Sequence, residues 1–236
     1  MATTPEIILT EGQQNALDAI YQFLLDPNEV AFVLSGFSGC GKTTLVRTLL
    51  DKMPDFFKAI KLVNPAFKEY ELMLTATTNK AAENLYRISG TTTSTIHSAL
   101  GIMVMTDYKT RQTKLTIKKN RINNPLTRHI LFIDEASYVD KELLGLIFKM
   151  TRDCKIIFVG DPAQLAPVKS QNTPVFEASF ASAALTEVVR QAKGNPIIDL
   201  ATNFRHTVNT GKWMQFTPDN HHVHYLNQED FLKEIE

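Results

Sequence analysis

The 236-residue sequence contains only two cysteines, Cys40 and Cys154, which is too few for the disulfide framework of a small secreted protein and typical of a reducing compartment. No apolar run approaches the ~18 residues of a membrane span, and the first residues lack the pattern of a signal peptide. The net charge is zero, so any binding of nucleic acid depends on local patches. We expect a soluble cytoplasmic protein with no membrane partner, long enough for one large or two small domains.

A glycine-rich motif at residues 36–43 carries the most specific signal. It reads G-x-x-x-x-G-K-T, and it lies between the apolar run Val30–Ser35 and a helical pattern. In such a loop the backbone N–H groups face phosphates, the lysine reaches the β- and γ-phosphates, and the next hydroxyl holds Mg²⁺. This context favours an ATP-binding loop over a plain glycine-rich turn. The residues expected to bind ATP are Gly36, Ser38, Gly39, Cys40, Gly41, Lys42, Thr43 and Thr44, with Lys42 also catalytic and Thr43 also a metal ligand.

Two adjacent carboxylates follow a second apolar run. Residues 130–133 are Ile-Leu-Phe-Ile, and Asp134 and Glu135 come directly after them. Acids often cap strand ends, but downstream of a phosphate loop this pair indicates separate chemical roles. We expect Asp134 to hold Mg²⁺ through its water shell and Glu135 to orient and deprotonate the attacking water.

A third motif leaves another apolar run and turns on Asp161–Pro162. Gln164 follows this turn, and its amide can donate to a phosphate oxygen while it accepts from water. Gln164 is therefore a catalytic candidate that senses the γ-phosphate. A plain Asp-Pro turn is the alternative interpretation.

The order of elements predicts an α/β fold with a parallel sheet flanked by helices. Short apolar runs bounded by turn residues indicate buried parallel strands, expected at Val30–Ser35, Tyr70–Thr75, His129–Asp134 and Lys155–Gly160. Helical patterns lie between them, at Lys42–Lys52, Lys80–Ser89 and Lys141–Thr151. The stretch Pro54–Tyr70 is interpreted as a loop. Ligands of such sheets bind at the carboxyl ends of the strands, where all the motifs above are placed.

A basic segment lies between Asp107 and Arg128, with seven cations against one anion, while the rest of the chain is acidic. Around Tyr108 to Thr116 the residue types alternate, which favours a small β-hairpin projecting from the main domain. The alternative is a solvated charged loop.

Taken in order, these motifs resemble a known family. The runs are GFSGCGKT, TATTNKAAENL, STIHSALG, ILFIDEAS, VGDPAQLAPV and LTEVVRQ. They resemble the first motor domain of superfamily 1 helicases of the 5′-to-3′ branch, of the phage Dda-type and RecD-like group, from about Leu9 to about Asp230. The resemblance implies a RecA-like P-loop NTPase motor domain at residues 1–100 and 129–236, with residues 101–128 as an inserted hairpin, or pin, subdomain.

The resemblance also implies roles for residues that composition alone leaves unassigned. Gln13 would read the adenine edge, although its segment is equally a capped helix start. Arg190 would reach the γ-phosphate as a catalytic arginine, or else form a surface ion pair. Single-stranded DNA would be bound by residues of two motifs and of the pin, namely Thr77, Thr78, Asn79, Lys80, Thr95, His97, Tyr108, Lys109 and Arg111.

The expected function is that of the ATP-binding half of an ATP-dependent 5′-to-3′ DNA helicase, with ATP and Mg²⁺ as cofactors. Its partners would be single-stranded DNA, a duplex junction and single-strand-binding or replisome proteins. The motor would be monomeric and, if phage-encoded, located in the host cytoplasm. It would serve replication, repair or recombination. The alternative is a nucleotide-gated binding module for DNA or protein that does not unwind. Because the family completes its ATP site with a second motor domain, we expect slow hydrolysis and no unwinding by this chain alone. For His221–His224 a solvated strand edge is expected rather than a metal cluster.

Overall fold

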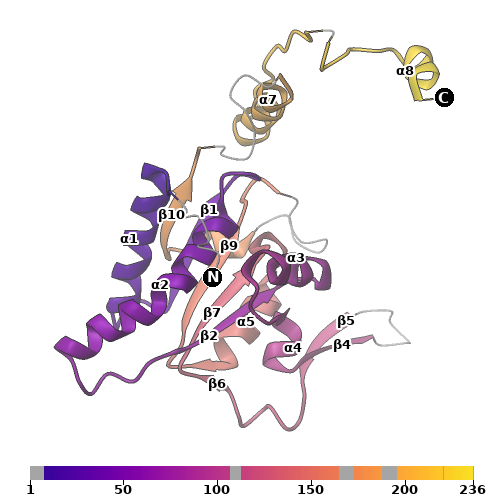
Figure 1. Cartoon of the computed structure of the whole chain (residues 1–236). Helices are drawn as coiled ribbons and strands as arrows, with labels where there is room; N and C mark the ends of the chain where they lie inside the picture. Colours follow the sequence, from indigo (N-terminus) through magenta and orange to yellow (C-terminus); the bar gives the residue numbers. More distant parts are fainter. Residues whose placement is uncertain (1–7, 107–112, 165–172, 188–195, 220, 236) are drawn as a thin grey trace. The chain divides into compact units, whose positions relative to one another are not determined.

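A six-stranded parallel sheet forms the centre of the computed structural model, which describes residues 8–106, 113–164, 173–187, 196–219 and 221–235 (Figure 1). The strand order is β10-β1-β9-β7-β2-β3. The strands are β1 (Ala31–Gly36), β2 (Glu71–Ala76), β3 (Thr93–Thr95), β7 (His129–Asp134), β9 (Lys155–Gly160) and β10 (Ala181–Leu185). The predicted parallel α/β sheet is therefore confirmed, and the four predicted strands match to within one residue.

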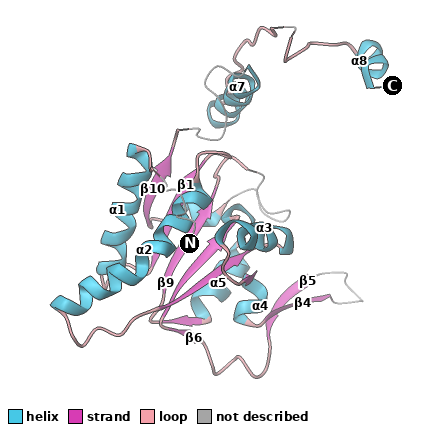
Figure 2. Cartoon of the chain, viewed as in Figure 1, coloured by secondary structure: helices cyan, strands magenta, loops and turns pink. Residues whose placement is uncertain are grey.

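Helices cover both faces of this sheet (Figure 2). On one face lie α1 (Glu11–Leu25), α2 (Lys42–Val63) and α3 (Asn79–Ser89). On the other lie α4 (Ile96–Leu100), α5 (Lys141–Lys149) and α6 (Pro174–Glu177). Alternate strand residues face the two layers: Phe132 of β7 packs with the first helices and Ile133 with the second. Strands buried on both faces have no polar side to show, which explains their continuous apolar runs.

Helix α2 corrects the prediction that residues 54–70 are a loop, because it continues through Pro54 to Val63. A proline inside a helix removes one backbone hydrogen bond and normally ends or kinks it. Here aromatic packing outweighs that cost, since Phe57 is buried and Phe56 stacks on Tyr21 of α1 with ring centroids 4.6 Å apart. The helix is thus stabilised by tertiary contacts that local sequence does not reveal.

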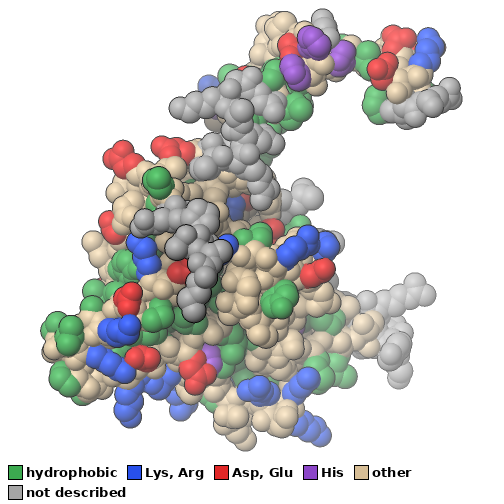
Figure 3. All heavy atoms as spheres, viewed as in Figure 1, with side chains coloured by type: hydrophobic (Ala, Val, Ile, Leu, Met, Phe, Trp, Pro, Cys, Tyr) green, Lys and Arg blue, Asp and Glu red, His purple; other side chains and the backbone are tan. Residues whose placement is uncertain are grey.

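The basic segment includes part of a separate two-stranded antiparallel sheet. Its strands are β4 (Ile102–Thr106) and β5 (Thr113–Ile117), and the connecting residues 107–112 lie outside the described residues. Leu115 packs against the core and its N–H donates to Glu142 Oε1 at 3.1 Å, which ties β5 to α5. Figure 3 shows Lys and Arg side chains gathered at the foot of the view, where the chain runs from β5 to β6 (Leu126–Thr127). The role of residues 101–128 as a pin subdomain remains a prediction.

Residues 189–236 form a second unit, separate from residues 1–188, with helices α7 (Pro196–Thr210) and α8 (Gln228–Ile235). The expected strand edge at His221–His224 is wrong, because Asp219 Oδ1 accepts the backbone N–H groups of His221, His222 and Val223 at 2.9–3.1 Å. Those N–H groups cannot then pair with a strand. The domain ranges expected above remain a prediction. None of the described helices is long and apolar enough to cross a membrane.

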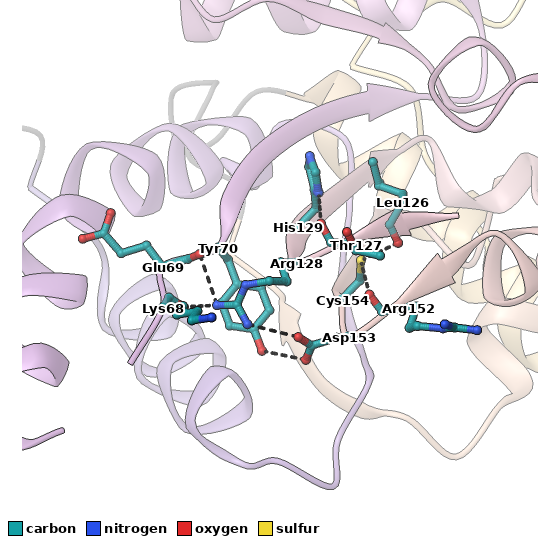
Figure 4. Close-up of polar contacts among 10 residues, drawn as sticks. All are labelled: Lys68, Glu69, Tyr70, Leu126, Thr127, Arg128, His129, Arg152, Asp153 and Cys154. Carbon is teal, nitrogen blue, oxygen red and sulfur yellow. Dashed lines mark hydrogen bonds and ion pairs between the residues drawn. The ribbon is translucent and has the colours of Figure 1, made fainter. Parts of the chain in front are cut away.

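Arg128 ties together three segments that enter the sheet at its amino edge (Figure 4). Its guanidinium donates to Asp153 Oδ2 at 3.1 Å, just before β9, and to the carbonyls of Lys68 and Glu69, just before β2. The same group lies over the ring of Tyr70, 5.3 Å from its centroid, and the Tyr70 hydroxyl donates to Asp153. Arg128 itself precedes β7 with a left-handed backbone (φ 57°). We call these residues the Arg128 staple.

We predict that Arg128→Met lowers the free energy of unfolding by about 1–2 kcal/mol, because it removes the charge-assisted hydrogen bonds to Asp153 and to the carbonyls of Lys68 and Glu69. Urea denaturation followed by circular dichroism measures this change. Arg87→Met is the matched control: Arg87 donates to Asn84 three residues away in α3, an exposed contact whose loss should cost less than about 0.5 kcal/mol. Equal losses in the two variants would contradict a stapling role.

Candidate active site

The loop between β1 and α2 has the backbone conformation that phosphate binding needs. Gly39 and Gly41 have left-handed φ values of 85° and 84°, which side chains other than glycine rarely adopt. At Gly36 a Cβ would lie 2.6 Å from the Cys40 Sγ and 2.8 Å from the Leu185 carbonyl oxygen. The loop therefore packs so tightly that only glycine fits there. Its N–H groups and the N-terminus of α2 form the concave anion site of this loop class.

Lys42 and Cys40 complete the loop. The Lys42 ammonium donates to the carbonyls of Gly36 and Phe37 at 2.7 and 2.9 Å, so its side chain bends back onto the phosphate loop. The Cys40 side chain is buried beneath the loop, and burial raises the pKa of its thiol. A phosphate at this position would offer Lys42 a charged acceptor in exchange for the neutral carbonyls.

Gln13 lies against the same loop. Its Nε2 donates to the Cys40 carbonyl at 3.3 Å, and its Oε1 accepts the N–H of Thr10 at 3.0 Å as part of a capping box at the start of α1. The side chain is only 3% exposed. An adenine that takes both hydrogen bonds of this amide has to displace these two contacts. The adenine-reading role of Gln13 remains a prediction.

Asp134 and Glu135 follow β7, where the backbone changes hand. Glu135 is left-handed (φ 56°, ψ 45°), and its N–H donates to Asp134 Oδ1 at 3.0 Å. Burial raises the pKa of both carboxyls, and each change is opposed by nearby Lys42; the pKa of Glu135 is raised further by Asp134. The left-handed residue thus turns the chain sharply at the point where the two carboxyls leave β7.

Thr43 of α2 and Asp134 at the end of β7 are neighbours, since both border one small cavity whose other lining residues are apolar; the cavity itself is not a metal site. A hydroxyl and a carboxylate from these two elements suit Mg²⁺, which usually takes one or two protein ligands and completes its shell with water and phosphate oxygens. Within the described residues no group of three His, Cys, Asp or Glu side chains could hold a metal by itself. The donor set thus fits a cation that arrives with a nucleotide.

Gln164 is held by a residue that the sequence did not single out. The Ser137 hydroxyl donates to Gln164 Oε1 at 3.3 Å, and Ser137 is fully buried in the short turn after Glu135. Asp161, also unassigned from sequence, is 1% exposed, and its Oδ1 accepts the N–H of Ala163 at 3.0 Å. Its charge acts on Glu135, raising the pKa of that carboxyl. The Asp-Pro signal marked a turn but not this electrostatic neighbour.

The residues predicted to bind single-stranded DNA lie at the same edge of the sheet. Thr78 caps α3, accepting the N–H of Ala81 at 3.2 Å, and Asn79 and Lys80 are exposed in its first turn. Thr95 caps α4 in the same way, accepting from Ser98. These contacts are made by hydroxyl oxygens, so the hydroxyl protons remain available to another acceptor.

His97 follows Thr95 on α4 and is half-buried. Burial lowers the pKa of its imidazole, against the opposing effect of Asp140. A neutral ring at pH 7 suits a hydrogen bond better than an ion pair. The other predicted site residues, Tyr108, Lys109, Arg111 and Arg190, lie outside the described residues, and their roles remain predictions.

We predict that Gly36→Ala weakens binding of a fluorescent ATP analogue by roughly tenfold or more, because relieving a contact this short costs about 1–3 kcal/mol in the loop. Gly145→Ala is the control. A Cβ at Gly145 in α5 meets open space, so this change should leave binding unaltered and slightly stabilise the helix. Full nucleotide affinity in Gly36→Ala would show that the loop does not form the site.

Glu135 also predicts a pH dependence of stability. Its pKa is raised on folding, so the folded chain binds this proton more tightly than the unfolded chain, and stability is lost as pH rises through the folded pKa. Glu135→Gln should therefore be more stable than the parent chain at pH 7, and the difference should shrink near pH ~4. Urea denaturation at both pH values tests this, with the exposed Glu83→Gln as control. A destabilised Glu135→Gln at pH 7 would refute the assignment.

The chain is similar to known proteins in sequence and in fold. It is 30% identical over 212 residues to the ATP-dependent DNA helicase dda of Enterobacteria phage T4, covering 87% of this chain and 43% of that protein. It is also 30% identical over 222 residues to RecBCD enzyme subunit RecD of Buchnera aphidicola subsp. Schizaphis graminum, covering 84% and 34%. The chain thus spans less than half the length of these relatives.

The crystal structure of Pif1 helicase from Candida albicans matches with a TM-score of 0.50 and 22% identity, over 91% of this chain and 46% of that one, which supports the RecA-like fold. A family model described as an AAA domain matches residues 8–228. The expected likeness to superfamily 1 helicases of the 5′-to-3′ branch is confirmed by these relatives, and the chain belongs to the AAA-domain family.

Proposed function

We propose that this chain is the ATP-binding motor unit of a DNA helicase that moves 5′ to 3′ along single-stranded DNA. The observation that carries the proposal is the common edge of the sheet. The phosphate loop after β1, the carboxylates after β7 and the loop Thr77–Lys80 after β2 all emerge there. Because β7, which ends in the ATP-site carboxylates, pairs directly with β2, which leads into the DNA-binding loop, the two sites can affect each other through this strand pair.

At the nucleotide, each side chain has a distinct task. The loop N–H groups and Lys42 would bind the β- and γ-phosphates, and Gln164 would contact the γ-phosphate. Mg²⁺, held by Thr43 and Asp134, would neutralise charge on the phosphate oxygens. Glu135 accepts a proton from water as the water oxygen bonds to the γ-phosphorus and the bond to the ADP oxygen breaks. Arg190 would stabilise the transferring phosphoryl group.

On the strand side, the first turn of α3 offers backbone N–H groups, the Thr78 hydroxyl, the Asn79 amide and the Lys80 ammonium to DNA phosphates. Thr95 and His97 extend this surface from the neighbouring β3 and α4. Within the basic segment, Lys109 and Arg111 would contact the backbone and Tyr108 would stack on a base at the duplex junction. These contacts recognise phosphate and stacking, so they bind DNA with little regard to sequence.

The matched relatives are more than twice as long as this chain, which indicates that a complete motor requires further parts. Movement along a strand needs two parts that open and close around the nucleotide. We propose that a second motor domain supplies the remaining half of the ATP site and the DNA track. This chain alone then binds nucleotide and DNA, hydrolyses ATP slowly and does not unwind. Rapid DNA-stimulated hydrolysis by this chain alone would refute that division of labour.

The proposal predicts that the chain binds oligothymidylate with a log–log salt slope near −0.7 for each phosphate that it neutralises. Lys80→Ala should weaken binding and make the slope less negative by about 0.7. Fluorescence anisotropy across a salt series, with and without a non-hydrolysable ATP analogue and Mg²⁺, measures both effects.

Lys58→Ala is the matched control for this experiment. Lys58 is an exposed lysine of α2 paired with Asp55 three residues away, as Lys80 is paired with Glu83. If the two variants bind oligothymidylate alike, the α3 surface is not the site that binds single-stranded DNA. Nucleotide-dependent DNA binding combined with no unwinding, even when a second motor domain is supplied, would instead support a nucleotide-gated binding module.

A further inference from the structure

Thr77 lies between the strand-binding loop and the carboxylates. The parallel register of β2 and β7 pairs Ala76 with Asp134, so the next residues, Thr77 and Glu135, leave the sheet side by side. The Thr77 N–H donates to the Asp134 carbonyl at 3.2 Å, which continues the strand ladder. The Thr77 hydroxyl donates to the Glu135 carbonyl, also at 3.2 Å. A side chain assigned to DNA thus holds the main chain of the proposed general base.

The backbone conformation of Glu135 requires stabilising contacts. Its left-handed backbone costs about 1–3 kcal/mol for a residue with a side chain and persists only where neighbouring contacts impose it. The N–H is fixed by Asp134 Oδ1, and the carbonyl accepts the N–H of Tyr138 at 3.1 Å as well as the Thr77 hydroxyl. Of these contacts, the one from Thr77 comes from another strand. It is therefore the contact that a ligand of the β2 loop can reach.

A hydroxyl has only one proton to donate. Thr78 accepts its capping bond, so its proton remains available to a phosphate oxygen, whereas the proton of Thr77 is already donated to Glu135. A DNA phosphate is an acceptor and competes for that proton. Thr77 cannot donate to a phosphate and hold the Glu135 carbonyl at the same time.

We propose that Thr77 is a positioning residue that couples the strand-binding loop to the backbone of Glu135. A DNA phosphate that accepts a hydrogen bond from the Thr77 hydroxyl releases the Glu135 carbonyl, which allows the left-handed turn and the Glu135 side chain to adopt a second arrangement at the nucleotide. By thermodynamic reciprocity, a nucleotide that favours one arrangement of this turn changes the affinity of the loop for DNA by the same factor. The inference rests on the proposed function, since it requires both ligands.

The test measures this coupling directly. The dissociation constant of labelled oligothymidylate is determined by anisotropy with and without a saturating non-hydrolysable ATP analogue and Mg²⁺, and the ratio of the two constants is the coupling factor. We expect a factor of about fivefold or more for the parent chain. In Thr77→Val, which keeps the shape and loses the donor, the factor should fall below about twofold. Thr77→Ser, which keeps the donor, should restore it.

Thr75→Val is the matched control. Thr75 also belongs to β2, and its hydroxyl donates to a carbonyl of β7, that of Phe132 at 2.7 Å, but away from the carboxylates. This variant should keep the coupling factor of the parent chain even where it lowers the melting temperature. A parent factor near one, an unchanged factor in Thr77→Val, or an equal loss in Thr75→Val would overturn the role of Thr77. Failure to bind the nucleotide or the oligonucleotide at all would instead overturn the proposed function.

Discussion

The parallel pairing of β1, β9, β7 and β2 is the constraint on which the site depends. Parallel strands all end at one edge, so residues far apart in the sequence meet there without any direct attraction between them. The pairing itself is stabilised by strands that bury both faces, with Phe32 and Phe132 in one layer and Val33 and Ile133 in the other. Apolar burial therefore determines where the charged chemistry is located.

The two edges of the sheet have opposite characters. At the carboxyl edge the chain contains a left-handed Glu135 and two half-buried carboxyls, Asp134 and Glu135, whose pKa burial raises; these features cost free energy. At the amino edge the Arg128 staple joins three incoming segments with hydrogen bonds and a cation–π contact. The hydrogen-bonded amino edge thus lies opposite the edge that carries the loops of the proposed site. This arrangement is common where a rigid scaffold supports reactive loops.

Much of this edge could be predicted from sequence, because strand, loop and helix signals were strong and local. The strand at His129–Asp134 and the phosphate loop followed from short apolar runs and a spaced motif. What could not be predicted depends on pairs distant in the chain: the bond from Thr77 to Glu135 spans 58 residues, and that from Ser137 to Gln164 spans 27. The helix through Pro54 was missed for the same reason, since aromatic contacts with distant Tyr21 support it.

Burial of the Cys40 side chain gives the phosphate loop a built-in chemical reporter. A thiol that is covered and whose pKa is raised forms little thiolate, so it reacts slowly with alkylating agents and oxidants. Any movement that opens the loop uncovers the sulfur and raises that rate. The rate of alkylation at Cys40 thus reports how often the loop opens, and a nucleotide that closes the loop should lower that rate.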